Sequence, residues 1–172
     1  YLMDFCDHGG SWLYGMCSDD TDGDDFTMLE VRSIYETVRA DTGKIKLFDV
    51  IGYDECLMSD VSVDYDEMPY VGYICNSEDS IAGDGWEYNL VLEPITLNPN
   101  MGGEEAAFHV FQAYVDMYGT SGSLSTMSII NTTVFYHDLV PAINNLAQKG
   151  MHEISGYTTD LQNCANNAMD WQ

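Results

Sequence analysis

The chain has 172 residues, which is enough for one domain with a substantial core and short for two. Lys and Arg together number 5 against 29 Asp and Glu, so the formal net charge is −24 at pH 7. This charge argues against nucleic acid or an anionic membrane as a partner. Basic peptides and Ca²⁺ fit the charge, and so does a solubilising acidic surface with no specific ligand.

The cysteines are odd in number and irregularly spaced, without a C-x-x-C pair: Cys6, Cys17, Cys56, Cys75 and Cys164. A zinc knuckle or a disulfide scaffold is therefore not expected, and at least one thiol should be free. No apolar run reaches the roughly 18 residues of a membrane span. The chain opens directly in an apolar run without a signal peptide, which indicates a fragment or processed chain whose earlier strands are missing. We treat residues 1–172 as a single, partial domain.

The first elements alternate between strand and helix. Tyr1 to Cys6 reads as a short buried strand that ends at Asp7-His8-Gly9-Gly10. Ser18 to Asp25 reads as an acidic surface loop, and it fails the EF-hand pattern at the first and last ligand positions. Thr27-Met-Leu-Glu30 is a capping box, which predicts a helix that ends before Gly43.

A second strand and helix surround Cys56. Ile45 to Gly52 is apolar and predicts a strand, Leu57 to Glu67 follows with helical periodicity, and Tyr70 to Cys75 predicts a third strand. Strands that alternate with helices in this way favour a parallel sheet, whose sites gather at the C-terminal ends of the strands. Cys56 would then lie at a sheet edge and near a helix N-terminus, where backbone N–H groups favour a thiolate.

The second half of the chain is less regular. Tyr88 to Leu97 has an ambiguous pattern that is loop-like around Pro94 and Pro99, and Gly103 to Tyr118 predicts a helix with one apolar face. The expected remainder is a strand at 123–130, a helix at 134–149 with a kink at Pro141, and a last helix from Thr158.

The pair that carries chemistry is His8 and Cys56. Each follows a predicted strand, and neighbouring parallel strands deliver their C-terminal ends to one edge, so the two side chains should meet there. A Cys/His pair suits nucleophilic acyl transfer, because imidazole helps to generate the thiolate and later protonates the leaving amine. The backbone N–H groups of Gly9 and Cys56 would stabilise the oxyanion. The remaining cysteines, and His109, His137 and His152, have no matching partner and are expected to be structural.

Three ordered motifs resemble the clostripain family of cysteine peptidases, which belongs to the clan of caspases, legumain and gingipain. They are Asp7-His8-Gly9-Gly10-Ser11-Trp12, Asp54-Glu55-Cys56-Leu57-Met58, and Ser77-Glu78 leading to Gly85-Trp86. The resemblance implies an α/β fold of the caspase-haemoglobinase type, a three-layer sandwich with a mostly parallel sheet.

The resemblance also assigns roles to residues. It implies a His8/Cys56 dyad, cleavage after Arg and less readily after Lys, and secretion or display at the cell surface. Asp54 occupies the position of an acid in the pocket for the basic side chain, and Asp84 with Trp86 is the candidate second contribution to substrate binding. A carboxylate in a narrow pocket suits guanidinium because it forms a charge-assisted, bidentate bond.

Two departures from the family stand out. The segment between His8 and the helix after Thr27 is acidic and holds no Lys or Arg, so maturation by self-cleavage within it is not expected. With opening strands absent, the sheet should have an unprotected edge. No cofactor is required for the chemistry, although Ca²⁺ binding through Asp19 to Asp25 is an alternative to a solvated acidic loop.

Three hypotheses follow. The leading one is a cysteine endopeptidase that acts on basic peptides or proteins through a Cys56 thioester. The second is a catalytically silent relative that binds basic peptides or Ca²⁺ through its acids. The third is metal-dependent hydrolysis through His8 with Asp7 or Asp54, which lacks a second histidine at ligand spacing.

Overall fold

A computed structural model describes residues 1–119 and 126–168. The chain divides into two compact units, Tyr1–Thr133 and Val134–Gln172. The sheet, its covering helices and every residue of the predicted site belong to the first unit.

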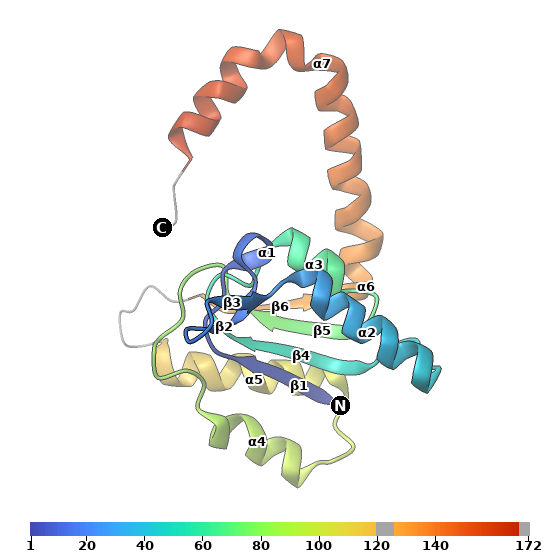
Figure 1. Cartoon of the computed structure of the whole chain (residues 1–172), viewed down its shortest axis with the longest axis vertical. Coiled ribbons are helices and arrows are strands. Elements are labelled where there is room, and N and C mark those ends of the chain that lie inside the picture. Colours follow the sequence, from blue (N-terminus) through green and yellow to red (C-terminus); the bar gives the residue numbers. More distant parts are fainter. Residues whose placement is uncertain (120–125, 169–172) are drawn as a thin grey trace. The chain divides into compact units, whose positions relative to one another are not determined.

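The first unit is built on a four-stranded sheet in the order β1-β4-β5-β6 (Figure 1). β1 (Leu2–Cys6), β4 (Phe48–Asp54) and β5 (Val71–Asn76) are parallel, and β6 (Ser128–Asn131) runs antiparallel to β5. The mostly parallel sheet predicted from the sequence is confirmed. β1 lies at one edge of this sheet, so its outer side pairs with no described strand.

Helices cover both faces of the sheet and produce three layers (Figure 1). α2 (Met28–Thr42) and α3 (Val61–Glu67) cover one face, and α4 (Tyr88–Leu97) and α5 (Gly103–Tyr118) cover the other. Each face has its own apolar core, since alternate residues of a strand point to opposite sides. The first core includes Met28, Val31, Ile51, Tyr53 and Ile74, and the second includes Val50, Cys75, Trp86, Val91 and Val110.

α2 has the predicted boundaries because its ends are capped. The Thr27 hydroxyl accepts the Glu30 N–H at 3.3 Å, and the Glu30 carboxylate accepts the Thr27 N–H at 3.0 Å. The helix stops at Gly43, which adopts the left-handed conformation that glycine favours (φ 66°). The capping box read from the sequence is therefore confirmed.

α4 replaces a segment that was expected to be a loop, so that prediction is wrong. Pro94 lies inside the helix, where its missing N–H removes one backbone hydrogen bond. Val91 is buried in the second core, and α4 packs along α5. Tertiary packing therefore outweighs the local cost of the proline.

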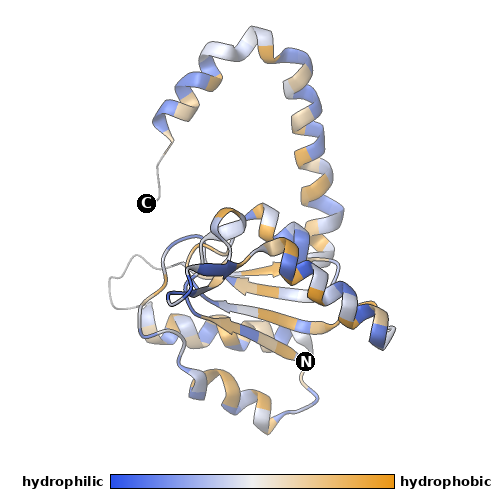
Figure 2. Cartoon of the chain, viewed as in Figure 1, coloured by the Kyte–Doolittle hydropathy of each residue, from blue (hydrophilic) through white to orange (hydrophobic). Residues whose placement is uncertain are grey.

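The predicted acidic loop is also wrong, because two short strands run through it. β2 (Met16–Asp19) and β3 (Asp24–Phe26) form an antiparallel hairpin in which Met16 pairs with Phe26. Met16 is fully buried and anchors the hairpin to the first core. The hairpin is otherwise strongly hydrophilic, and Figure 2 shows it in blue against the orange of the central strands. A four-residue helix, α1 (Ser11–Tyr14), connects it to β1.

The second unit is helical. α6 (Thr132–Val134) leads into a π-helical turn, η1 (Phe135–Leu139), and then into α7 (Val140–Asn167). The predicted pair of helices is therefore one continuous helix, with Pro141 in its first turn, directly after the π-helical turn. None of the helices in the described ranges is long and apolar enough to cross a bilayer. The strand expected at 123–130 is β6, and residues 123–125 of that prediction lie outside the described residues.

Candidate active site

The topology brings His8 and Cys56 to one edge of the sheet. β1 and β4 are adjacent and parallel, and their last paired residues are Cys6 and Asp54. His8 lies two positions after Cys6, and Cys56 lies two positions after Asp54. Gly9 packs directly on the Cys56 segment, because a Cβ on Gly9 would lie 2.6 Å from the Cys56 carbonyl oxygen. Only glycine fits at this contact, which holds the His8-Gly9 backbone beside the Cys56 turn.

Cys56 lies in a turn, and the loop after β5 holds this turn in place. The Leu57 N–H donates to the Asp79 carbonyl at 3.3 Å, and the Ile81 N–H donates to the Cys56 Sγ at 3.4 Å. Leu57 adopts a left-handed conformation with φ 64°, which is uncommon for a residue with a side chain. The strained turn thus presents Cys56 at the edge, with a backbone donor on its sulfur.

The helix after Cys56 begins later than predicted. α3 starts at Val61, because the Asp60 carboxylate caps it by accepting the Ser62 N–H at 2.7 Å. Leu57 is not helical, so the expected placement of Cys56 at a helix N-terminus is wrong. The N–H that reaches the Cys56 sulfur comes from Ile81, a donor that the sequence did not reveal.

Asn76 fixes the segment that follows the turn. It is fully buried at the end of β5, and its amide donates to the Met58 carbonyl at 3.0 Å and to the Asp64 carboxylate at 2.9 Å. Ser128 in β6 donates to the Asn76 side-chain oxygen at 2.9 Å. Burial raises the pKa of Asp64 to about 7, against the opposing effect of the Asn76 bond. This network links α3, β5 and β6 to the Cys56 turn.

Asp54 is the last residue of β4 and is only 3% exposed. Its Oδ2 accepts hydrogen bonds from the backbone N–H of Trp86 at 2.9 Å and from the Tyr88 hydroxyl at 2.9 Å, and the Cys6 thiol lies 3.7 Å away. Gly85 turns beneath it with φ 68°, and a Cβ on that glycine would lie 2.6 Å from Asp54 Oδ2. The loop that carries Asp84, Gly85 and Trp86 therefore packs against Asp54.

Asp84 and Trp86 differ in exposure. Asp84 has an exposed side chain, one residue before the Gly85 turn, and its charge raises the pKa of Tyr118 after the larger effect of burial. Trp86 is 4% exposed, and its ring lies over Gly52, where a Cβ would come within 2.7 Å of the ring. The structure thus places Asp54 and Trp86 together inside the protein and Asp84 at the surface of the same loop.

Glu55, for which the sequence suggested no role, ties the β2–β3 hairpin to the Cys56 turn. It is fully buried, and its Oε1 accepts the Cys17 N–H at 3.2 Å and lies 3.1 Å from the Cys17 thiol. Burial raises the pKa of Glu55 to about 7 and that of Cys17 to about 12. Cys6 and Cys17, expected to be structural, both contact acids next to Cys56.

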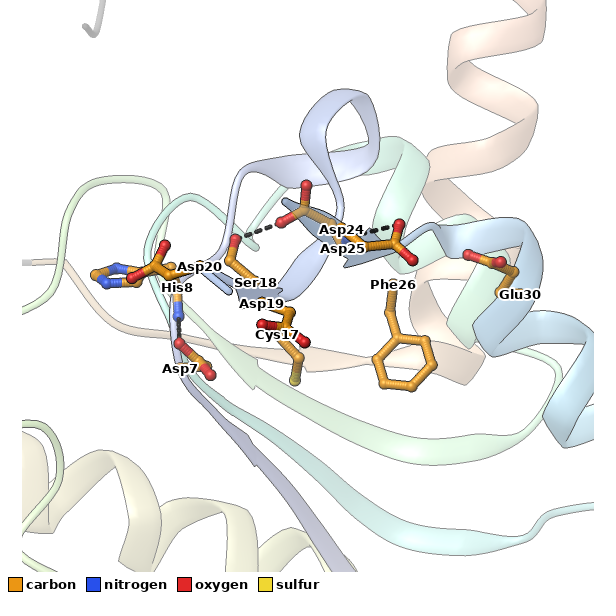
Figure 3. Close-up of a pocket in the computed structure, with 10 residues that line it drawn as sticks. All are labelled: Asp7, His8, Cys17, Ser18, Asp19, Asp20, Asp24, Asp25, Phe26 and Glu30. Carbon is orange, nitrogen blue, oxygen red and sulfur yellow. Dashed lines mark hydrogen bonds between the residues drawn. The ribbon is translucent and has the colours of Figure 1, made fainter. Parts of the chain in front are cut away.

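A cavity of about 610 Å³ opens between His8 and the hairpin (Figure 3). Its lining is strongly acidic and consists of Asp7, His8, Cys17, Ser18, Asp19, Asp20, Asp24, Asp25, Phe26 and Glu30. Across the described ranges, no three Asp, Glu, His or Cys side chains gather closely enough to hold a metal ion, and this includes the acids from Asp19 to Asp25. The cavity is therefore an anionic surface beside His8, and it suits a positively charged chain segment.

Solved structures similar to this chain include cysteine proteases from Bacteroides. A secreted C11 cysteine protease from Bacteroides thetaiotaomicron, solved with an irreversible peptide inhibitor, shares 20% identity at a TM-score of 0.62, over 77% of this chain and 40% of that one. A cysteine protease from B. fragilis shares 17% identity at a TM-score of 0.54, over 69% and 47%. A clostripain from B. thetaiotaomicron, in complex with a peptide inhibitor, shares 14% identity at a TM-score of 0.53, over 68% and 48%.

These similarities confirm the α/β fold of the caspase-like type. The chain spans less than half the length of these solved proteases. No protein among curated sequences matches it. The sequence profile of the clostripain family matches residues 1–170, so nearly the whole chain follows the pattern of that family. The chain therefore belongs to the clostripain family.

Proposed function

We propose that this chain carries the catalytic residues of a cysteine endopeptidase, with Cys56 as the nucleophile and His8 as its acid–base partner. The observation that carries the proposal is the packing of Gly9 on the Cys56 carbonyl, which brings the ends of β1 and β4 together. Membership of the clostripain family supports a peptidase. The Ile81 N–H, 3.4 Å from the Cys56 sulfur, would help to stabilise a thiolate there.

The reaction proceeds by acyl transfer. His8 accepts the Cys56 thiol proton as the sulfur attacks the scissile carbonyl carbon, and the backbone N–H groups of Gly9 and Cys56 stabilise the resulting oxyanion. His8 gives a proton to the leaving amine as the C–N bond breaks, which leaves a thioester. A water molecule then attacks the thioester while His8 accepts its proton, and the thiol is regenerated. The groups come from the protein alone, so the reaction requires no cofactor.

Asp54, with Asp84 and Trp86, is proposed to bind the side chain that precedes the cleaved bond. A buried carboxylate prefers a cation over a neutral side chain, and a guanidinium offers more donors than an ammonium does. We therefore expect cleavage after Arg, and less readily after Lys. The acidic cavity beside His8 would favour basic stretches elsewhere in the peptide.

The partners proposed are basic peptides or proteins. The net charge of −24 disfavours nucleic acid and anionic membranes. Secretion or display at the cell surface is proposed from the similarity to a protease described as secreted.

The test is the hydrolysis of fluorogenic peptide amides that end in Arg, Lys or norleucine by the complete protein in which this chain occurs. We expect the amide that ends in Arg to be cleaved best. Asp54→Asn should lower kcat/KM for this amide by an amount equivalent to about 2–5 kcal/mol of lost transition-state stabilisation, because a buried charge pair is lost, while kcat/KM for the norleucine amide changes little. Asp41→Asn, an exposed change on α2, is the matched control. Equal use of Arg and norleucine by the unmodified protein would remove the proposed specificity.

A further inference from the structure

Asp4 is the one charged residue in β1, and it lies on the same face of the sheet as Asp54. Asp4 pairs with Gly52, and Cys6 pairs with Asp54. Because alternate residues of a strand point to the same side, both carboxylates face the layer of α4 and α5. Gly52 has no side chain, and a Cβ there would lie 2.7 Å from Asp4 Oδ1. The glycine thus leaves the space that the Asp4 carboxylate occupies.

One hydroxyl joins the two carboxylates. The Tyr88 oxygen lies 2.8 Å from Asp4 Oδ2 and 2.9 Å from Asp54 Oδ2. A tyrosine hydroxyl has a single proton, so it can donate to only one of two ionised carboxylates. Burial raises the pKa of Asp4 to about 6, with a smaller contribution from the negative charge of Asp54. At neutral pH the two acids therefore compete for one donor.

The other oxygens of the pair have no partner. Asp4 Oδ1 and Asp54 Oδ1 are both buried without a hydrogen-bond donor, and Asp54 is 3% exposed. Buried acceptors of this kind are costly unless a donor reaches them. Tyr88 is 37% exposed, so displacement of its hydroxyl would open the pair to solvent.

We propose that the carboxylates of Asp4 and Asp54 together bind the basic side chain of the substrate. The cationic group of that side chain then replaces the Tyr88 hydroxyl as the donor between the two carboxylates. The inference rests on the proposed function and adds a specificity-determining residue to it. A guanidinium suits the pair because its several N–H groups can reach two carboxylates at once, whereas the Tyr88 hydroxyl supplies one proton. The pair thereby also explains a preference for Arg over Lys.

The experiment compares kcat/KM for Arg and norleucine amides in the complete protein, unmodified and as Asp4→Asn, Asp54→Asn and Asp41→Asn. The Arg-to-norleucine ratio is used because it cancels effects on His8, Cys56 and folding, which both substrates share. We expect Asp4→Asn to lower the ratio at pH 7.5 by about tenfold or more, since a bond to a charged group is lost. Asp41→Asn, which removes one exposed charge, should leave the ratio unchanged.

The pH dependence of the ratio gives a second readout. In the unmodified protein the ratio should rise between about pH 5 and pH 7, as Asp4 loses its proton, and the rise should be absent in Asp4→Asn. The role of Asp4 would be overturned if the ratio in Asp4→Asn stayed within about twofold of the unmodified value while the ratio in Asp54→Asn fell to near one. That result would leave the peptidase proposal standing. A ratio near one in the unmodified protein would contradict the proposed Arg specificity itself.

Discussion

Cys56→Ala is expected to lower kcat/KM for an Arg-terminated amide by at least about a thousandfold, because the variant lacks the sulfur that forms the thioester. Removal of a nucleophile typically leaves only the small rate enhancement that binding and the oxyanion hole supply. The Gly9 contact involves the backbone carbonyl of residue 56, so alanine should preserve the turn and the packing of the His8-Gly9 segment. The measurement is steady-state hydrolysis by the complete protein.

The matched control is Cys164→Ala, an exposed cysteine on α7. It removes a thiol from the second unit, outside the proposed dyad, and should keep full activity. Substantial hydrolysis by Cys56→Ala, at more than about a tenth of the unmodified rate, would mean that another group performs the attack.

Stability is expected to fall as pH rises from about 5 to about 8. The principal cause is Glu67, a fully buried acid of α3 whose pKa burial raises from 4.5 to about 8. Between these values the folded chain binds more protons than the unfolded chain, so the free energy of unfolding decreases with pH. Each pKa unit corresponds to about 1.4 kcal/mol, and the loss from Glu67 is on the order of 4 kcal/mol.

Other buried acids act in the same direction. Glu55 and Asp64 have pKa values raised to about 7, mainly by burial. The capping bonds that lower the pKa of Glu30, and the Tyr70 bond that lowers that of Glu36, stabilise the fold above the unfolded pKa of 4.5 and lose this effect only in more acidic solution. Glu30 and Glu36 therefore do not contribute to the fall in stability between about pH 5 and pH 8.

Glu67→Gln tests the assignment, because glutamine keeps the shape of the protonated acid and does not ionise. Urea unfolding followed by circular dichroism at pH 5, 6.5 and 8 should show a steep decline in the unmodified protein and a shallower one in Glu67→Gln. The stability of Glu105→Gln, which removes an exposed charge from α5, should decline with pH as steeply as that of the unmodified protein. An equal decline of the free energy of unfolding with pH in all three proteins would contradict the assignment of the pH dependence to Glu67.

The sequence predicted elements whose signals are local. The capping box and Gly43 define α2 because the side-chain and backbone groups involved are neighbours in the chain. The apolar runs define β1, β4 and β5, and the parallel topology then places His8 and Cys56 at one edge without further information. This much of the site depends only on the order of the elements.

The rest depends on contacts between distant residues. The start of α3 was predicted too early because apolar periodicity from Leu57 suggested a helix, whereas the left-handed turn and the Asp60 cap decide its beginning. α4 was missed because Pro94 disfavours a helix locally, and its packing on α5 reverses that preference.

Glu55 and Asp4 illustrate the same limit at the site. The partner of Glu55 is Cys17, on a hairpin that the sequence did not reveal. The partner of Asp4 is Tyr88, on a helix that was expected to be a loop. Asp4 is an isolated acid within an apolar strand, which is a signal in the sequence, whereas Glu55 follows Asp54 directly and carries no such signal.

The central claim is that His8 and Cys56 form one reactive pair, and covalent labelling tests it most directly. The complete protein is treated with a biotinylated peptide chloromethyl ketone that ends in Arg, and the adduct is mapped by mass spectrometry over time. We predict a single adduct on Cys56 that forms faster than any on Cys6 or Cys164, with a large loss of rate in His8→Ala. Equal labelling of these cysteines, or labelling of Cys56 at an unchanged rate in His8→Ala, would contradict the account.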